Sequence, residues 1–333
     1  MLKLHPEENI GAEVSTNSAA SKPTGNVVEI KGLTKRYGKK SVVDGLSLNV
    51  PKGCVYGLIG PNGAGKSTTL KSLMRLLRTS GGSMNVLGHD VTSDFQAVKH
   101  KIGYVPETHQ IYRWMKIKRV IQFTRSFYPT WNEQFCDQML QMMELDPEKK
   151  VKQLSKGMLA KLALLLAVSH EPELLVLDEP LSGLDPIVRD EFIDGVLKTI
   201  CEQETTVIFS SHTIGDIQRL ADSVGILYAG RLLVNESTET MLSESRQIKI
   251  VLNSETEHSL RGLPESTICE SQNGRELTVT VSRYSPAMEE AIAQENSVEH
   301  ISVERLNLED LFKAHIRGAK LRTLGKSKGV KDV

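Results

Sequence analysis

The sequence lacks several features that would place it in a particular class of protein. No apolar run approaches the ~20 residues that a membrane-spanning helix needs, and the longest is LALLLAV at residues 162–168. Lys plus Arg and Asp plus Glu both total 41, so the formal net charge is zero and bulk electrostatic binding of nucleic acid is not expected. The four cysteines show no Cys-x-x-Cys spacing, which favours reduced thiols in a cytosolic protein.

The N-terminal segment also lacks the apolar stretch of a signal peptide. Residues 1–25 are rich in small polar residues, and we expect them to form a disordered tail. The protein is therefore expected to be neither secreted nor membrane-spanning by itself.

From Val27 onward, apolar runs of strand length alternate with segments of helical spacing. GCVYGLIG, ELLVLDEP and TTVIFSSH have the composition of buried strands, and STTLKSLMRLL and RDEFIDGVLKTI have that of helices. Such alternation predicts an α/β fold with a mostly parallel sheet covered by helices on both faces.

The pattern changes twice along the chain. We expect a main domain over residues 26–240, mostly helical from about 93 to 160. The period-two runs QIKIVLN and ELTVTVS, with the helical segment SPAMEEAIAQ, predict a small C-terminal α+β domain over residues 246–316. Residues 317–333 are basic and contain glycine, which favours a flexible tail.

The stretch GLIGPNGAGKSTTL fits the pattern G-x-x-x-x-G-K-[ST], with an apolar strand before it and a helix after it. Backbone N–H groups of such a loop close around phosphate oxygens, and the helix N-terminus favours negative charge. Lys66 is expected to reach the β- and γ-phosphates, and the Ser67 hydroxyl to ligate Mg²⁺. The predicted nucleotide-binding residues of this loop are Gly60, Pro61, Asn62, Gly63, Ala64, Gly65, Lys66, Ser67 and Thr68.

A second motif, LLVLDEP, ends a buried strand with two carboxylates. Asp178 can hold Mg²⁺ through its hydration shell, and Glu179 can orient and deprotonate an attacking water. A DE pair alone could simply be the polar end of a strand. Together with the phosphate loop, it predicts a nucleotide triphosphatase.

The order and spacing of these motifs resemble the ATP-binding subunits of ABC transporters over residues 26–240. The stretch LSKGM resembles the family's signature, usually LSGGQ, and comprises Leu154, Ser155, Lys156, Gly157 and Met158, of which Lys156 and Met158 depart from the common form. PLSGLD resembles the family's D-loop, with Asp185 as its acidic residue. The resemblance implies that His212 contacts the γ-phosphate and helps to hold Glu179, and that Tyr37 stacks on adenine.

The same resemblance implies a P-loop NTPase fold of ABC type, with an antiparallel β subdomain and a helical subdomain. ATP and Mg²⁺ are the implied cofactors. The family's Q-loop glutamine aligns with Glu107 in GYVPETHQ, which would make Glu107 a third Mg²⁺ ligand, and Gln110 is the alternative.

The family's arrangement also implies partners. Each ATP would lie between the phosphate loop of one subunit and the signature of a second ABC subunit, as in a homodimer. The phrases FYPTWN, LDPEKKVKQLSKGM and LNLEDLF resemble the subfamily paired with type-2 exporter permeases. An integral membrane permease is thus expected, no nucleic acid partner is expected, and the chain would lie in the cytoplasm, peripheral on the inner face of the cell membrane.

Three points stay open from the sequence. The aromatic and methionine side chains between the Q-loop and the signature could be core or could line a groove for a membrane partner; they are Tyr112, Trp114, Met115, Tyr128 and Trp131. A non-transport ABC ATPase acting on nucleic acid or the ribosome is one alternative function. A regulatory ABC protein with weak hydrolysis is another.

Overall fold

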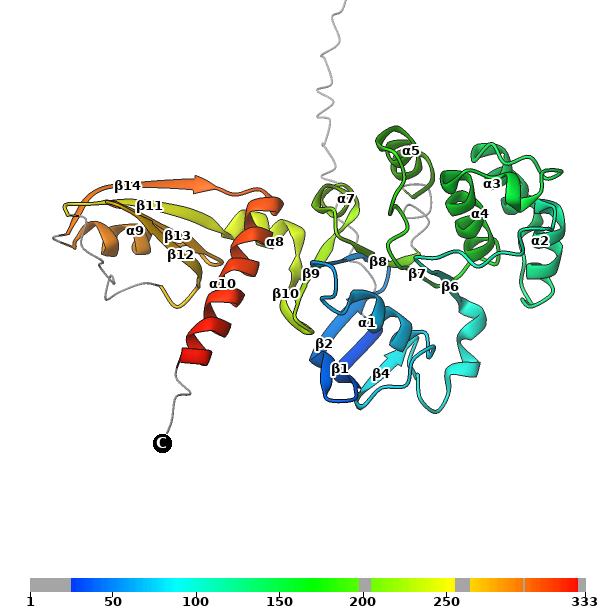
Figure 1. Ribbon diagram of the computed structural model, residues 1–333, viewed down its shortest axis with the longest axis horizontal. Helices are drawn as coiled ribbons and strands as arrows, with labels where there is room; N and C mark the ends of the chain where they lie inside the picture. Colours follow the sequence, from blue (N-terminus) through cyan, green and yellow to red (C-terminus); the bar gives the residue numbers. More distant parts are fainter. Residues whose placement is uncertain (1–24, 198–204, 255–263, 296, 329–333) are drawn as a thin grey trace, which may run out of the picture.

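The computed structural model describes residues 25–197, 205–254, 264–295 and 297–328 (Figure 1). Most of the expected N-terminal tail, residues 1–24, lies outside the described residues. Within the described part the strands form three sheets. No helix in this part of the chain is both long and apolar enough to cross a membrane.

The central sheet has the strand order β10-β9-β3-β8-β7-β6. Its strands are β3 (Val55–Ile59), β6 (Ile102–Val105), β7 (Leu174–Leu177), β8 (Thr206–Ser211), β9 (Ser223–Tyr228) and β10 (Arg231–Ser237). All neighbours are parallel except β10, which runs antiparallel to β9. Every residue of β3, β7 and β8 is buried, as expected for strands with both faces covered.

An antiparallel sheet of order β2-β1-β4-β5 lies below the central sheet in Figure 1. It consists of β1 (Asn26–Tyr37), β2 (Lys40–Pro51), β4 (Gly81–Val86) and β5 (His89–Asp90). Helix α1 (Lys66–Leu73) shares one apolar cluster with both sheets, through Leu70 and Leu73 on the helix, Ile30 of β1 and Leu58 of β3. This packing fixes the start of α1, and with it the phosphate loop.

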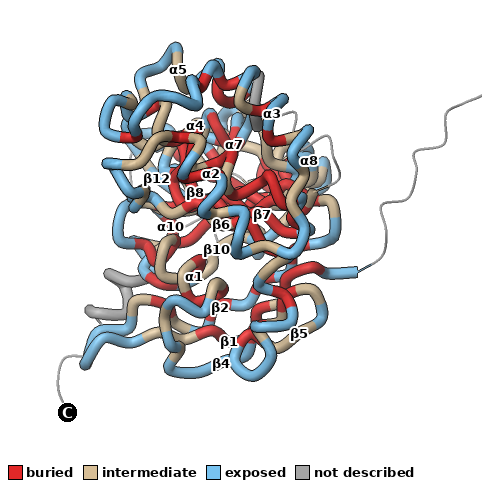
Figure 2. Tube along the Cα trace, turned by 90° about the vertical axis from the view of Figure 1, so that its right-hand side faces the viewer, coloured by how far each residue is buried: buried red, intermediate tan, exposed pale blue. Residues whose placement is uncertain are grey.

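The helical region lies at the other end of the central sheet, beside β6 (Figure 1). It contains α2 (Ile117–Arg125), α3 (Glu133–Met142) and α4 (Lys156–Val168), with short 3₁₀ turns at Phe95–Ala97, Lys99–Lys101 and Val151–Gln153. Strand β6 interrupts the range that was expected to be mostly helical. Figure 2 shows the buried core where β7, β8, α4 and α7 (Ile214–Leu220) meet.

The aromatic residues of this region divide between core and surface. Trp131 and Met115 pack against the main apolar core. Tyr112 and Trp114 are 53% and 69% exposed. The core interpretation is therefore confirmed for Met115 and Trp131, and the groove interpretation stays open for Tyr112 and Trp114.

Helix α5 (Pro186–Glu191) continues as a π-helical segment, Phe192–Leu197. The remainder of the helix expected from RDEFIDGVLKTI lies outside the described residues. Helix α8 (Thr238–Glu244) leads from the main domain into the C-terminal part.

The C-terminal part contains an antiparallel sheet of order β12-β13-β11-β14. Its elements are β11 (Arg246–Leu252), β12 (Thr267–Asn273), β13 (Glu276–Val281), α9 (Pro286–Ala293) and β14 (Val298–Arg305). The buried residues Ile248, Ile250 and Leu252 alternate along β11 and form a separate apolar core with Ile292 of α9.

The flexible tail expected from residue 317 is wrong up to Lys328, because helix α10 (Leu308–Lys328) runs through this boundary. Its first turn buries Leu308 and Leu311 in the main core. Gly318 lies where a Cβ would collide with the Ile268 carbonyl oxygen of β12, and Arg322 donates to the same oxygen at 3.3 Å. The glycine that suggested a tail is thus required for a close helix–strand contact.

Candidate active site

The predicted site residues meet at one edge of the central sheet. Gly60 directly follows β3, Asp178 follows β7, His212 follows β8, and Glu107 lies just beyond β6. The carboxyl ends of adjacent parallel strands lie side by side, and ligands of open α/β sheets bind at this edge. Topology therefore gathers residues that are far apart in the sequence.

A cavity of about 450 Å³ opens at this edge. Its lining contains most of the predicted phosphate loop and the residues expected to act on the γ-phosphate. The lining residues are Val42, Asn62, Gly63, Ala64, Gly65, Lys66, Ser67, Thr68, Glu107, Glu179, Ser182 and His212.

The phosphate loop ends at Gly65, which has a φ of 112° and lies where a Cβ would approach the Val42 carbonyl oxygen to 2.9 Å. Any other residue would be strained at this position, because it would combine a positive φ with a close contact of its Cβ. Helix α1 begins at the next residue, so its unpaired N–H groups face the cavity end of the loop. Lys66 Nζ donates to the Gly60 carbonyl oxygen at 2.8 Å and lies 3.1 Å from Glu179 Oε1.

The oxygen atoms beside Lys66 fit a magnesium ion. Ser67 Oγ donates to Asp178 Oδ1 at 2.8 Å. Asp178 Oδ2 is buried and has no hydrogen-bond partner among the described residues. Burial raises the pKa of the Asp178 carboxyl, against hydrogen bonds from Ser67 and Ser210 that lower it. Mg²⁺ is a hard cation that prefers oxygen ligands, and a hydroxyl beside an unsatisfied carboxylate oxygen supplies them.

Glu179 is held on three sides. Its φ is 50°, a left-handed conformation that costs free energy in a residue other than glycine and is found most often at functional sites. Its backbone N–H donates to Ser210 Oγ at 2.9 Å, and His212 Nδ1 lies 2.7 Å from Glu179 Oε2. The carboxylate therefore lies between Lys66 and His212, where it can accept a proton from a water near the γ-phosphate.

The signature residues form the start of α4. Ser155 is the N-cap, and its hydroxyl accepts a hydrogen bond from the Met158 N–H at 3.2 Å. Lys156 extends toward the D-loop, where a Cβ on Gly183 would collide with its Nζ atom. None of the five signature residues lines the cavity of the phosphate loop.

The other predicted residues lie around the site without closing it. Asp185 is the N-cap of α5 and accepts from the Val188 N–H at 3.1 Å. Glu107 lines the cavity, whereas Gln110 does not. Tyr37, at the end of β1, is 50% exposed, and Lys35 Nζ lies 4.7 Å from its ring centroid. Its stacking role stays a prediction.

Ser210 is a site residue that sequence reasoning missed. Its hydroxyl donates to Asp178 Oδ1 at 3.0 Å and accepts from the Glu179 N–H. The available signal was a pair of serines, SSH, at the end of an otherwise apolar strand. A buried hydroxyl at such a strand end needs partners, and the carboxylates of the neighbouring strand supply them.

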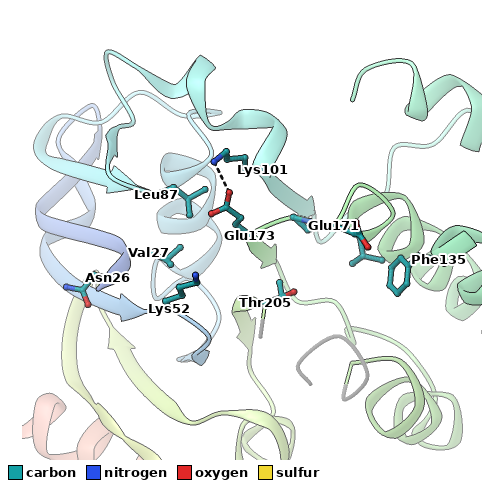
Figure 3. Close-up of a pocket in the computed structure, with 11 residues that line it drawn as sticks. Asn26, Val27, Lys52, Leu87, Lys101, Phe135, Glu171, Glu173 and Thr205 are labelled. Atoms are coloured by element: carbon teal, nitrogen blue, oxygen red, sulfur yellow. Dashed lines mark ion pairs between the residues drawn. The ribbon is translucent and has the colours of Figure 1, made fainter. Parts of the chain in front are cut away.

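A larger cavity, of about 730 Å³, lies at the opposite ends of the strands (Figure 3). Lys101, Glu173 and Thr205 line it, and each directly precedes a strand of the central sheet. Figure 3 shows the ion pair between Lys101 Nζ and Glu173 Oε1, at 2.8 Å. None of the predicted site residues lines this cavity, so it is distinct from the nucleotide site.

Comparison with known proteins agrees with this geometry. Residues 43–182 match the family model described as ABC transporter. The chain is 33% identical over 223 residues to the bacitracin transport ATP-binding protein BcrA of Enterococcus faecalis, covering 66% of this chain and 72% of that protein. It is 33% identical over 228 residues to the daunorubicin/doxorubicin resistance ATP-binding protein DrrA of Streptomyces peucetius, covering 67% and 68%.

The fold is similar to a solved structure described as the ATP-binding subunit of an ABC transporter. The TM-score is 0.59 at 25% identity, over 65% of this chain and 92% of that one. The family and the fold expected from the motifs are thus confirmed. The chain belongs to the ABC transporter family as one of its ATP-binding proteins, and it is an ATPase.

Proposed function

We propose that this protein is the energising subunit of an ABC exporter. The observation that carries the proposal is the convergence of Lys66, Glu179 and His212 on one cavity, with the carboxylate 3.1 Å and 2.7 Å from the two basic groups. The named relatives support export, since one serves bacitracin transport and another confers daunorubicin and doxorubicin resistance.

In the proposed reaction the loop from Gly60 to Thr68 binds the triphosphate of ATP. Ser67 and Asp178 would hold Mg²⁺, and Glu107, which lines the same cavity, is proposed as a third ligand. The ion would neutralise charge on the phosphates. Glu179 accepts a proton from the attacking water, and His212 keeps that carboxylate in place. A phosphate that binds Lys66 competes with Glu179 for it, which would free the carboxylate for the water.

A second copy of the chain would complete each site. The signature lies outside the cavity of its own phosphate loop, yet it presents a hydroxyl and a helix N-terminus, both suited to an anion. In a twofold dimer the signature of one copy would face the ATP of the other. ATP would favour the closed dimer, and hydrolysis would reopen it.

A membrane permease would receive this motion. Tyr112, Trp114, Phe123 and Phe127 form an exposed aromatic surface on the helical region, with exposed fractions from 42% to 69%. Their rings contact one another with centroid separations of 5.0 to 6.2 Å. Exposed aromatic patches of this kind mark interaction sites, and a permease bound there would hold the protein at the inner face of the cell membrane.

Light scattering of the Glu179→Gln variant, with and without ATP and Mg²⁺, tests the proposal. Removing the base should trap the ATP-bound dimer, so the mass should double on addition of ATP. Ser155→Arg in the same background should abolish the doubling, because it places a bulky cation at the signature. A monomer under all conditions would contradict the homodimer.

A regulatory ABC protein with weak hydrolysis is the second candidate. It is favoured by Glu107, which adds negative charge beside the phosphates, and by Met158, which replaces the usual signature glutamine. A wild-type protein that dimerises with ATP but shows no Glu179-dependent turnover would favour this candidate over the exporter subunit.

A further inference from the structure

Two helices that follow the active-site loops are joined by an ion pair outside the cavity. Arg189 of α5 donates from Nη2 to Asp216 Oδ2 of α7 at 2.5 Å. The Asp216 side chain is 5% exposed and that of Arg189 is 24% exposed, so water is largely excluded. Removing one partner of such a pair leaves the other charge uncompensated. The pair is therefore a firm link between α5 and α7.

On the α7 side this link reaches the backbone around His212. Ser211 Oγ donates to Asp216 Oδ2 at 2.9 Å and accepts from the Thr213 N–H at 3.0 Å. Ser211 and Thr213 are the chain neighbours of His212. Asp216 thus orients the hydroxyl that fixes the turn carrying the imidazole.

On the α5 side the link reaches the D-loop. The Arg189 N–H donates to the Asp185 carbonyl oxygen at 2.9 Å, so Arg189 lies one helical turn after the cap residue. A displacement of Asp185 therefore moves the base of the Arg189 side chain. Through Asp216 and Ser211, such a displacement would reach the turn of His212.

We propose that Arg189 and Asp216 are positioning residues, which hold His212 against Glu179 only while the D-loop helix is correctly placed. This inference rests on ATP hydrolysis at the site described above. According to this inference, proton transfer to Glu179 requires two things. His212 must contact Glu179 directly, and α5 must be correctly placed.

The same two helices supply a matched control. Arg219 of α7 pairs with Asp190 at 2.5 Å and with Asp194 at 2.6 Å. These side chains are 37%, 62% and 50% exposed, and exposed pairs contribute little to stability. They join α5 and the π-helical segment Phe192–Leu197 to α7. Neither ion pair involves Ser211, His212 or Thr213.

The test compares steady-state ATP hydrolysis by full-length wild type, Arg189→Met, Asp216→Asn, Arg189→Lys and Arg219→Met. We expect kcat to fall about 10- to 100-fold in the first two variants, with KM within about twofold, because loss of correct placement slows the chemical step. Arg189→Lys should recover part of the rate. Arg219→Met should stay within about twofold of wild type.

The decisive readout is non-additivity. Adding His212→Ala to Arg189→Met should cost much less than His212→Ala costs in wild type, because both changes act through one group. Equal losses in the two backgrounds would overturn the proposal, as would an equal fall in kcat for Arg219→Met.

If Asp216→Asn fails to fold, Ser211→Ala removes the hydrogen bond between Asp216 and the turn of His212 with a smaller change. It should still lower kcat about 3- to 10-fold. An inactive wild type would instead contradict the proposed function.

Discussion

Ser210 shows how much a single residue of the site depends on tertiary contacts. One hydroxyl serves the metal-side carboxylate Asp178 and the backbone of the proposed base Glu179. Both partners come from the end of β7, while Ser210 belongs to β8. The hydroxyl therefore fixes two functional groups relative to the neighbouring strand.

We predict that Ser210→Ala lowers kcat about 10-fold while ATP affinity changes little, because the phosphate loop is not altered. Two buried groups lose a partner, so the free energy of unfolding should fall by about 1–3 kcal/mol. ATPase assays and urea unfolding measure both effects. Ser169→Ala is a suitable control, since Ser169 is buried at the C-terminal cap of α4, its hydroxyl donates to the Leu165 carbonyl oxygen at 2.7 Å, and it lies outside the cavity lining.

A control that loses stability equally but keeps its kcat would support this role for Ser210. If both serine variants kept wild-type turnover, the hydroxyl would be structural only. At this scale the sequence predicted Lys66, Ser67, Asp178 and Glu179, because their types occur at motif spacing. Ser210 is not part of a motif with a defined spacing. A serine in an apolar strand is usually a structural residue, so its role in the site was not predicted.

Among the elements, the connection from α4 to β7 contains a buried imidazole. His170 is 2% exposed and stacks on Tyr128 with ring centroids 3.9 Å apart. Burial of the ring disfavours its charged form, and the backbone of Ile102 only partly opposes this effect. Burial lowers the pKa of His170 from 6.5 to about 4, so the folded protein holds it neutral.

This lowered pKa predicts a loss of stability in acid. Between pH 6.5 and about 4 the unfolded chain binds a proton at His170 and the folded chain does not. The contribution of His170 to the free energy of unfolding should therefore be fully present above pH 6.5. It should fall by up to about 3 kcal/mol as the pH decreases toward the pKa of the folded state. His170→Phe keeps a ring against Tyr128 and should make the fall shallower.

Urea unfolding across this pH range measures the slope. His300→Phe, on the exposed surface of β14, should leave the slope unchanged. A slope remaining in His170→Phe is expected from His315 of α10, because burial lowers its pKa to about 4 as well. Identical slopes in wild type and His170→Phe would show that His170 does not contribute.

For the molecule as a whole, α10 adds a connection between the C-terminal sheet and the rest of the structure. Leu308 and Leu311 share the main core with Ile217 of α7 and Met241 of α8. The C-terminal sheet is therefore attached through a packed helix in addition to the chain at β11. This attachment lies close to α7, the helix that follows His212.

The proposed permease contact is also a property of the whole molecule. We predict that the double variant Trp114→Ser/Phe123→Ser keeps its ATPase activity in isolation, since neither residue lines the nucleotide cavity. It should no longer sediment with membranes of cells that express the full transporter, because the loss of two aromatic anchors removes much of the contact energy. Sedimentation followed by immunodetection gives the result.

Leu76→Ser provides the comparison, because Leu76 is 60% exposed and lies after α1, away from the helical region. Its membrane association should equal that of wild type. Retention of the Trp114→Ser/Phe123→Ser variant on membranes would locate the permease contact elsewhere on the surface.

The sequence by itself determined the chemistry and the family. The phosphate loop, the paired carboxylates and the signature are contiguous stretches, and local spacing is enough to specify backbone turns and the ends of helices and strands. Only the tertiary structure decided which distant groups act together. Three contacts join residues between 27 and more than 90 positions apart: Ser210 with Asp178, Arg189 with Asp216, and α10 with the main core. Such contacts depend on strand order and helix packing, which no short sequence pattern encodes.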